Sequence, residues 1–105
     1  MKTYIHNKVT FLVGTTADEN WKLILSADPD YSWVHMAGVP SAHVIIEVDD
    51  DPSPEELAHA ARLCAEQTKT PCKSFVHTKI HNLRLAAKPG SVSFRKSQPT
   101  SFQLR

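Results

Sequence analysis

The sequence has little glycine, few cysteines and no long apolar run. Its 105 residues include three glycines and two cysteines, too few for a glycine-rich segment or a framework of several disulfides. No stretch approaches the roughly 20 apolar residues of a membrane-spanning helix, and the first residues lack the apolar centre of a signal peptide. We therefore expect a single domain over residues 1–105, in the cytosol or nucleus with the cytoplasm as our prediction, without a membrane partner and with both thiols free.

Acidic residues are nearly absent from the second half of the chain. Residues 57–105 hold nine Lys or Arg and one acidic residue, a balance of +8, whereas residues 1–56 hold three Lys and ten acidic residues, a balance of −7. Such asymmetry between halves indicates a polyanionic partner. Two alternatives remain: the acidic and basic surfaces neutralise each other within the fold, or the basic face is simply solvated.

Six segments have the apolar patterns of strands. They are residues 5–13, in which a turn at Asn7-Lys8 separates two strands, and residues 31–36, 43–48, 73–77, 91–95 and 101–105. The nearly continuous apolar run in 43–48 predicts a central strand that is covered on both faces. We expect 91–95 and 101–105 to pair as a hairpin, and residues 79–89 to form a polar, basic loop.

Two segments carry the N-terminal capping signals of helices. Thr16 with Glu19, and Ser53 with Pro54 and Glu56, match capping boxes. Apolar stripes follow, formed by Ala17, Trp21, Ile24 and Leu25 in the first helix and by Leu57, Ala60, Ala61 and Cys64 in the second. A crossover through the second helix would make strands 43–48 and 73–77 parallel neighbours. The pattern predicts an α+β fold, a single small domain with a mixed, largely antiparallel sheet and two helices.

Aromatic and imidazole rings are candidates for binding bases. Trp33 and His35 lie two residues apart on one predicted strand and so share a face. Rings on a sheet face can stack on unpaired bases. His43 opens the next strand. The alternative interpretation places Trp33 in the core and gives both histidines structural hydrogen bonds.

Cationic side chains of the second half are candidates for binding phosphates. Lys79, Arg84 and Lys88 fall in the predicted basic loop, and Arg95 follows in the next strand. Lysines and arginines on loops can follow a phosphate backbone, and such contacts supply affinity that weakens as salt rises. Together with the rings above, these residues form a candidate nucleic-acid site.

Signals for metal binding or catalysis are weak. Cys72, His77 and His81 have the spacing of half a zinc site, but a second half is missing. We expect the acidic run 49–51 to stabilise the positive end of the second helix rather than to bind a metal. No phosphate-binding glycine loop or nucleophile motif is present. We therefore predict no metal, no cofactor and no enzymatic activity.

Two separated motifs resemble the NFACT-R domain. Residues 30–35 (DYSWVH) and 40–46 (PSAHVII) resemble its first signature, in which an acidic residue, a Trp and a His precede a turn and a second His at the head of an apolar strand. Residues 77–79 (HTK), 82–84 (NLR) and 88–92 (KPGSV) resemble its second block. The order and spacing agree over nearly the whole chain.

The resemblance implies an RNA-binding role. NFACT-R is the C-terminal module of NEMF, Caliban and bacterial fibronectin-binding-protein-like (FbpA-type) proteins, which act in ribosome-associated quality control and bind the large ribosomal subunit and tRNA. As in the stand-alone form, the other domains of those proteins are missing from this sequence. His77 stands where Tyr is usual, and His81 where Lys is common. His81 thus joins Trp33, His35, His43 and the basic residues as a candidate contact.

Three hypotheses follow for the function. The first is an RNA-binding module for tRNA or ribosomal RNA; DNA is also compatible, because no feature here reads a 2′-hydroxyl. The second is an adaptor that docks on a protein through the acidic first half. The third is a phosphodiesterase that uses His35 and His43 as acid and base, or a zinc enzyme.

Overall fold

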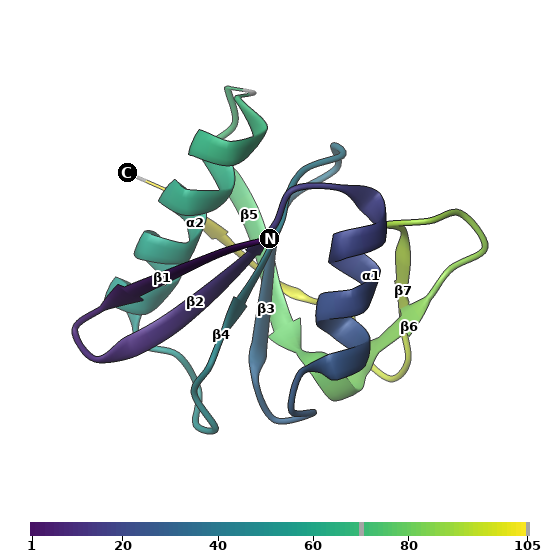
Figure 1. Ribbon diagram of the computed structural model, residues 1–105, viewed down its shortest axis with the longest axis horizontal. Coiled ribbons are helices and arrows are strands. Elements are labelled where there is room, and N and C mark those ends of the chain that lie inside the picture. The colour runs from purple at the N-terminus through teal and green to yellow at the C-terminus, as the bar shows by residue number, and fades with distance from the viewer. Residues whose placement is uncertain (70, 105) are drawn as a thin grey trace.

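A six-stranded sheet with one helix on each face organises the chain (Figure 1). The computed structural model describes residues 1–69 and 71–104; Thr70, near the predicted end of the second helix, and Arg105, in the last predicted strand, lie outside these residues. The elements are β1 (Lys2–His6), β2 (Val9–Gly14), α1 (Ala17–Ser26), β3 (Ser32–Met36), β4 (His43–Ile46), α2 (Pro54–Thr68), β5 (Ser74–Lys79), a 3₁₀ turn (Ile80–Asn82), β6 (Leu83–Leu85), β7 (Val92–Phe94) and β8 (Thr100–Gln103).

The large sheet has the strand order β1-β2-β4-β3-β5-β8, and β6 and β7 form a separate two-stranded sheet. All the described pairings are antiparallel. The predicted α+β class, with two helices and a mostly antiparallel sheet, is confirmed. The predicted parallel pair is wrong, because β3 lies between β4 and β5 and pairs with both.

Two hydrophobic clusters lie on opposite faces of the sheet. On one face, Val44 and Ile46 of β4 pack with Ala60, Ala61 and Cys64 of α2. On the other, Ile45 packs with residues of α1 and of the β6–β7 hairpin. All four residues of β4 are buried. The expectation of a central strand covered on both faces is confirmed.

The local signals of the sequence set most element boundaries. Asn7 and Lys8 both have positive φ, 50° and 67°, as in the two-residue turns that match the twist of a hairpin. Ser53 and Glu56 form the complete capping box at the start of α2. At α1 only half of the box forms: Thr16 accepts from the Glu19 backbone, while the Glu19 carboxylate accepts from Thr15 and pairs with the N-terminal amine.

The apolar stripe predicted for α1 is wrong by about one residue. The buried residues are Asn20, Leu23 and Ile24, whereas Leu25 is 72% exposed. Trp21 lies at the boundary and donates its Nε1 hydrogen to the carbonyl oxygen of Ser91, 3.0 Å away. The helix is rotated toward the β6–β7 hairpin, which this tryptophan helps to hold.

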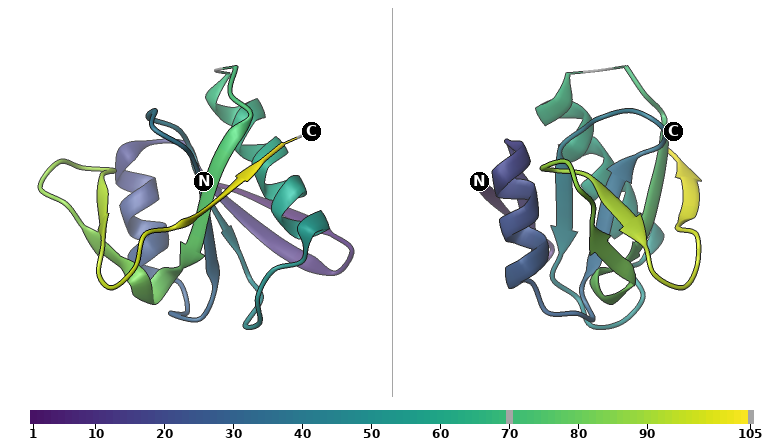
Figure 2. Two further views of the ribbon diagram at one scale, coloured as in Figure 1. Left: turned by 180° about the vertical axis from the view of Figure 1, so that it is seen from behind. Right: turned by 90° about the vertical axis from the view of Figure 1, so that its right-hand side faces the viewer.

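Two predictions for the last third of the chain are also wrong. Residues 79–89 are not one loop, because they contain the end of β5, the 3₁₀ turn and β6. Strand β7 pairs with β6, and β8 pairs with β5, so the expected hairpin of 91–95 with 101–105 does not form (Figure 2). Phe94 packs with Trp33 on the α1 face, whereas Phe102 packs with Phe75 on the α2 face. The sheet separates the two rings.

Candidate functional site

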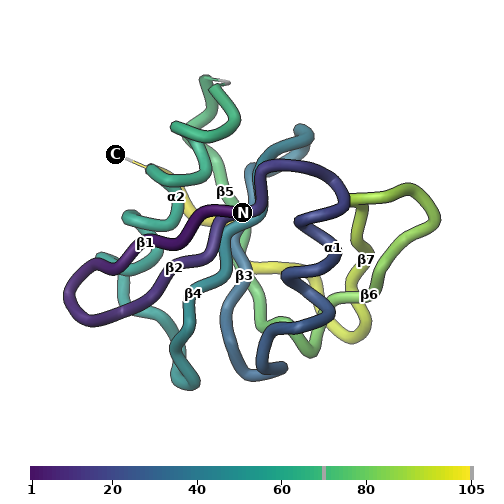
Figure 3. The backbone as a smooth tube through the Cα atoms, in the orientation of Figure 1, coloured from purple at the N-terminus to yellow at the C-terminus, as the bar shows by residue number. Residues whose placement is uncertain are grey.

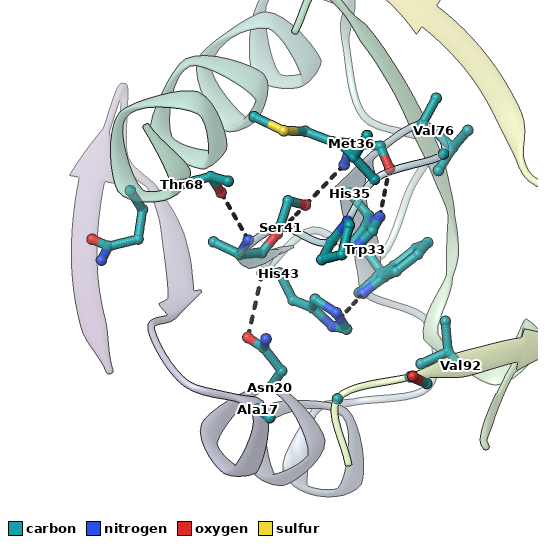
Figure 4. Close-up of a pocket in the computed structure, with 18 of the residues that line it drawn as sticks. Ala17, Asn20, Trp33, His35, Met36, Ser41, His43, Thr68, Val76 and Val92 are labelled. Carbon is teal, nitrogen blue, oxygen red and sulfur yellow. Dashed lines mark hydrogen bonds between the residues drawn. The ribbon is translucent and has the colours of Figure 1, made fainter. Parts of the chain in front are cut away.

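An open cleft of about 820 Å³ lies between α1, the β6–β7 loop and the C-terminal end of α2. Four segments form most of its walls: Thr15–Thr16 before α1, Gly38–Ser41 between β3 and β4, the end of α2 at Gln67 and Thr68, and Lys88–Ser91 between β6 and β7. Side chains of β3 and β4 form its floor (Figure 4). The cleft thus gathers residues from both motifs that resemble NFACT-R.

Trp33, His35 and His43 meet at this floor. The ring of His35 stacks on Trp33, with centroids 5.3 Å apart and an interplanar angle of 10°. His43 meets His35 edge to face at 4.9 Å, and Trp33 donates from Nε1 to His43 Nδ1 at 3.0 Å. Trp33 and His43 are each 1% exposed, while His35 is half-buried. A base could therefore reach His35 but not the faces of Trp33, which corrects our expectation that Trp33 itself stacks on a base.

Both histidines are uncharged near neutral pH. Burial lowers the pKa of His43 to about 3, with a smaller effect from the neighbouring His35 and an opposing one from the backbone of Gly90. Burial also lowers the pKa of His35, against the hydrogen bond to the Met36 carbonyl. They offer hydrogen bonds and ring faces rather than positive charge.

The hydrogen bonds define the tautomer of each ring. His35 Nδ1 lies 2.6 Å from the Met36 carbonyl oxygen, which only accepts, so Nδ1 carries the proton and Nε2 is an acceptor. His43 Nδ1 accepts from Trp33, so the proton of its neutral ring is on Nε2. The backbone of β4 is held in turn by Asn20, whose Oδ1 accepts from the His43 amide at 3.3 Å.

Two glycines allow the close approaches behind the cleft. A Cβ on Gly14 would lie 1.9 Å from Asn20 Oδ1, so only glycine leaves room for that amide. Gly90 has φ +84°, and a Cβ there would lie 3.0 Å from Ala17 Cβ. Gly90 thus brings the β6–β7 loop against the first turn of α1 and closes one wall of the cleft.

The predicted basic residues divide into two groups. Arg84, Lys88 and Arg95 lie on the β6–β7 hairpin: Lys88 lines the cleft, while the two arginines are exposed on the strand pair whose apolar residues face α1. His81 is exposed just before this hairpin. Lys79 lies elsewhere and donates to the carbonyl oxygens of Asp49 and Asp50, at 3.2 and 2.7 Å. It holds the backbone of the acidic run and does not line the cleft.

The cations of the hairpin have no carboxylate partners among residues 1–69 and 71–104. The two ion pairs within this part of the chain are those of the N-terminal amine with Glu19 and of His6 with Glu55. The interpretation in which acidic and basic halves neutralise each other by ion pairs therefore has no support from the described side chains. Arg84 and Lys88 have no partner among the described residues, whereas Arg95 donates from Nε to the Leu83 carbonyl oxygen, 3.0 Å away, and offers only its terminal nitrogens to an external anion.

Within the described residues, no group of three side chains is arranged to hold a metal ion. His77 packs edge to face on Phe102 at 5.6 Å, and the Cys72 thiol donates to the Ser74 carbonyl. No helix in the same part of the chain is long and apolar enough to cross a membrane.

Comparison with known proteins identifies a structural neighbour. No family model matches the chain, and no curated protein does. Among solved structures, the C-terminal part of the fibronectin/fibrinogen-binding protein of Streptococcus suis aligns with a TM-score of 0.85 and 25% sequence identity, over 97% of this chain. The chain has the fold of an FbpA-type C-terminal domain. This agrees with the resemblance of the two motifs, and the chain spans 43% of that neighbour.

Several residues of the cleft were not singled out from the sequence. Thr15, Thr16 and Asn20 line it, although Thr16 was predicted only as a helix cap and the other two belong to no predicted motif. Asn20 had a usable signal, because it falls three and four residues before Leu23 and Ile24 and so interrupts a buried helical stripe. For Thr16 the sequence offers a capping role alone, and for Thr15 it offers no signal.

Proposed function

We propose that the chain is an NFACT-R-like RNA-binding module that works in the cytoplasm, binds tRNA or ribosomal RNA and has no catalytic activity of its own. By the same resemblance, we propose a role in translation or ribosome-associated quality control. The contact surface is the β6–β7 hairpin, with Arg84, Lys88 and Arg95 on phosphates and the cleft beside it.

The observation that carries the proposal is the unpaired charge on this hairpin. Three cations lie on a short two-stranded element and its loop, and no described carboxylate pairs with them; Arg95 is anchored through Nε to the Leu83 carbonyl oxygen. Lysines and arginines held this way bind a phosphate backbone with counterion release, a sequence-independent source of affinity. These cations lie next to an open cleft. This favours a nucleic acid over a small anion, because a nucleic acid can contact the cations and fill the cleft at the same time.

Crosslinking in cells, followed by sequencing of the bound nucleic acid, tests the proposal. We expect tRNA or ribosomal RNA to be recovered with the wild-type chain. The amount of RNA recovered with the variant Arg84→Ala/Lys88→Ala/Arg95→Ala should be at least ten-fold lower than with the wild type.

The matched control is Lys2→Ala/Lys8→Ala/Arg62→Ala, which removes the same charge from exposed positions on β1, the β1–β2 turn and α2. These elements lie at the end of the molecule away from β6 and β7 (Figure 3). Equal recovery with both variants would contradict the assignment of the hairpin. Recovery of protein partners that survive nuclease treatment, with no RNA, would favour the adaptor hypothesis instead.

A further inference from the structure

We propose that the cleft between α1 and the β6–β7 loop receives one unpaired nucleobase, stacked on His35, while the cations of the hairpin hold the adjoining phosphates. This inference rests on the proposed RNA binding and specifies the form of RNA, a strand with an unpaired end or loop. A continuous duplex would leave the cleft empty.

The size and shape of the cleft suit a base. Its volume of about 820 Å³ lies in the range of small-molecule sites, about 300–1,000 Å³. It is open on one side, as the entry of a base from a strand requires. The volume is larger than one base needs, so it also has room for the attached sugar.

The charges are arranged for a base inside and phosphates outside. The floor carries neutral imidazoles, so it offers no cation to balance a phosphate. The positive groups lie at the rim, with Lys88 on the cleft wall and Arg84 and Arg95 on the exposed face of the same hairpin. A nucleotide has the same distribution, with an uncharged ring at one end and an anionic backbone at the other.

His35 is the group that meets the base. One face of its ring is covered by Trp33, and its Nδ1 is held by the Met36 carbonyl, so the orientation of the ring is fixed before a ligand arrives. The half-buried ring lines the cleft, and its Nε2 is left as an acceptor for an exocyclic amine. A base there would extend the Trp33–His35 stack by one ring.

The test compares two RNA stems that differ in bases alone. Both carry a three-nucleotide 3′ extension, with normal bases in one and abasic in the other, so the added charge is equal. Because stacking contributes about 1–3 kcal/mol per base, we expect the stem with bases to bind wild-type protein about ten-fold more tightly. His35→Ala should reduce this difference to less than two-fold, and His35→Phe, which keeps a ring, should preserve most of it.

A second measurement uses the wild-type protein alone. A 2-aminopurine placed in the extension should gain fluorescence on binding, because the base leaves its neighbours in the strand for the cleft, while the same base inside the stem should not change. Equal affinity for the two stems, or a base preference that His35→Ala leaves intact, would overturn the inference while salt-dependent binding of both stems keeps the proposed function. If neither stem binds, the proposed function fails with it.

Discussion

At the scale of single residues, Trp33 and His43 act as a pair inside the protein. The sequence placed them as candidates for a ligand, but both are 1% exposed, and their one mutual hydrogen bond satisfies the indole N–H that burial would otherwise leave unpaired. The pair fixes the floor on which His35 lies. Of the three rings, His35 is the one that a ligand can contact.

The buried His43 makes the stability of the fold depend on pH. The folded protein keeps His43 neutral down to a pKa of about 3, whereas the unfolded chain protonates it near the ordinary value of 6.5. Between these values the unfolded state binds more protons, so stability is complete above about pH 6.5 and falls as the pH drops toward 3. The expected loss from this group between pH 7 and pH 5 is about 2 kcal/mol.

Chemical denaturation at pH 7 and pH 5 measures this loss, with His43→Gln as the comparison. Glutamine keeps an acceptor for Trp33 but does not titrate, so the variant should be less stable at pH 7 and lose about 2 kcal/mol less on acidification. Some pH dependence remains in the variant, because burial also lowers the pKa of His35. Identical losses in the two proteins would show that His43 is protonated in the folded state.

At the scale of elements, the docking of the β6–β7 hairpin on α1 determines whether the cleft exists. Gly90 and Gly38 allow this contact to be isolated, since both have positive φ, +84° and +75°, but only Gly90 has neighbours that an added Cβ would meet. Gly38→Ala should cost about 1–2 kcal/mol, from the backbone conformation alone. Gly90→Ala should cost roughly 1–3 kcal/mol more, because Ala17 must also move.

Hydrogen exchange locates the effect of these two substitutions. The Ala86 amide donates to the Ser91 carbonyl within the hairpin, 2.9 Å away. Its exchange should accelerate more in Gly90→Ala than in Gly38→Ala, after correction for the difference in global stability. Equal acceleration would mean that the hairpin does not depend on its contact with α1.

The elements also show how far a sequence of this kind can be interpreted. Capping boxes, the Asn7-Lys8 turn and the apolar run of β4 are local signals, so α2, the first hairpin and the central strand followed from them. The partners of β7 and β8 did not, because both strands alternate apolar and polar residues in the same way. Only packing distinguishes them, since Phe94 and Phe102 lie on opposite faces of the sheet.

The candidate site was likewise predicted in part. His35, Lys88 and the cleft-facing motifs were singled out from residue types and spacing. Lys79 was not separable from Arg84 by sequence, because both are cations of the predicted basic loop 79–89. Only the fold brings the Asp49 and Asp50 carbonyls to Lys79 and leaves Arg84 without such a partner.

At the scale of the whole molecule, the charge asymmetry of the sequence is only partly a separation in space, because Asp18 and Glu19 lie in the first turn of α1, beside the hairpin. The hairpin with Arg84, Lys88 and Arg95 lies beside α1, while the acidic run 49–51 lies before the start of α2, where Lys79 donates to its backbone (Figure 1). The net charge of +1 hides this separation. An RNA strand would approach the hairpin and avoid the acidic end of the sheet.

The slope of log Kd for tRNA against log salt concentration tests the hairpin interface most directly. Each lost phosphate contact lowers the slope by about 0.7–0.9, so Arg84→Ala/Lys88→Ala/Arg95→Ala should flatten it by about 2 and weaken binding at low salt. The control Lys2→Ala/Lys8→Ala/Arg62→Ala should keep nearly the wild-type slope. Equal slopes for the wild type and the hairpin variant, with equal affinity, would contradict the account, because phosphates would then be held elsewhere.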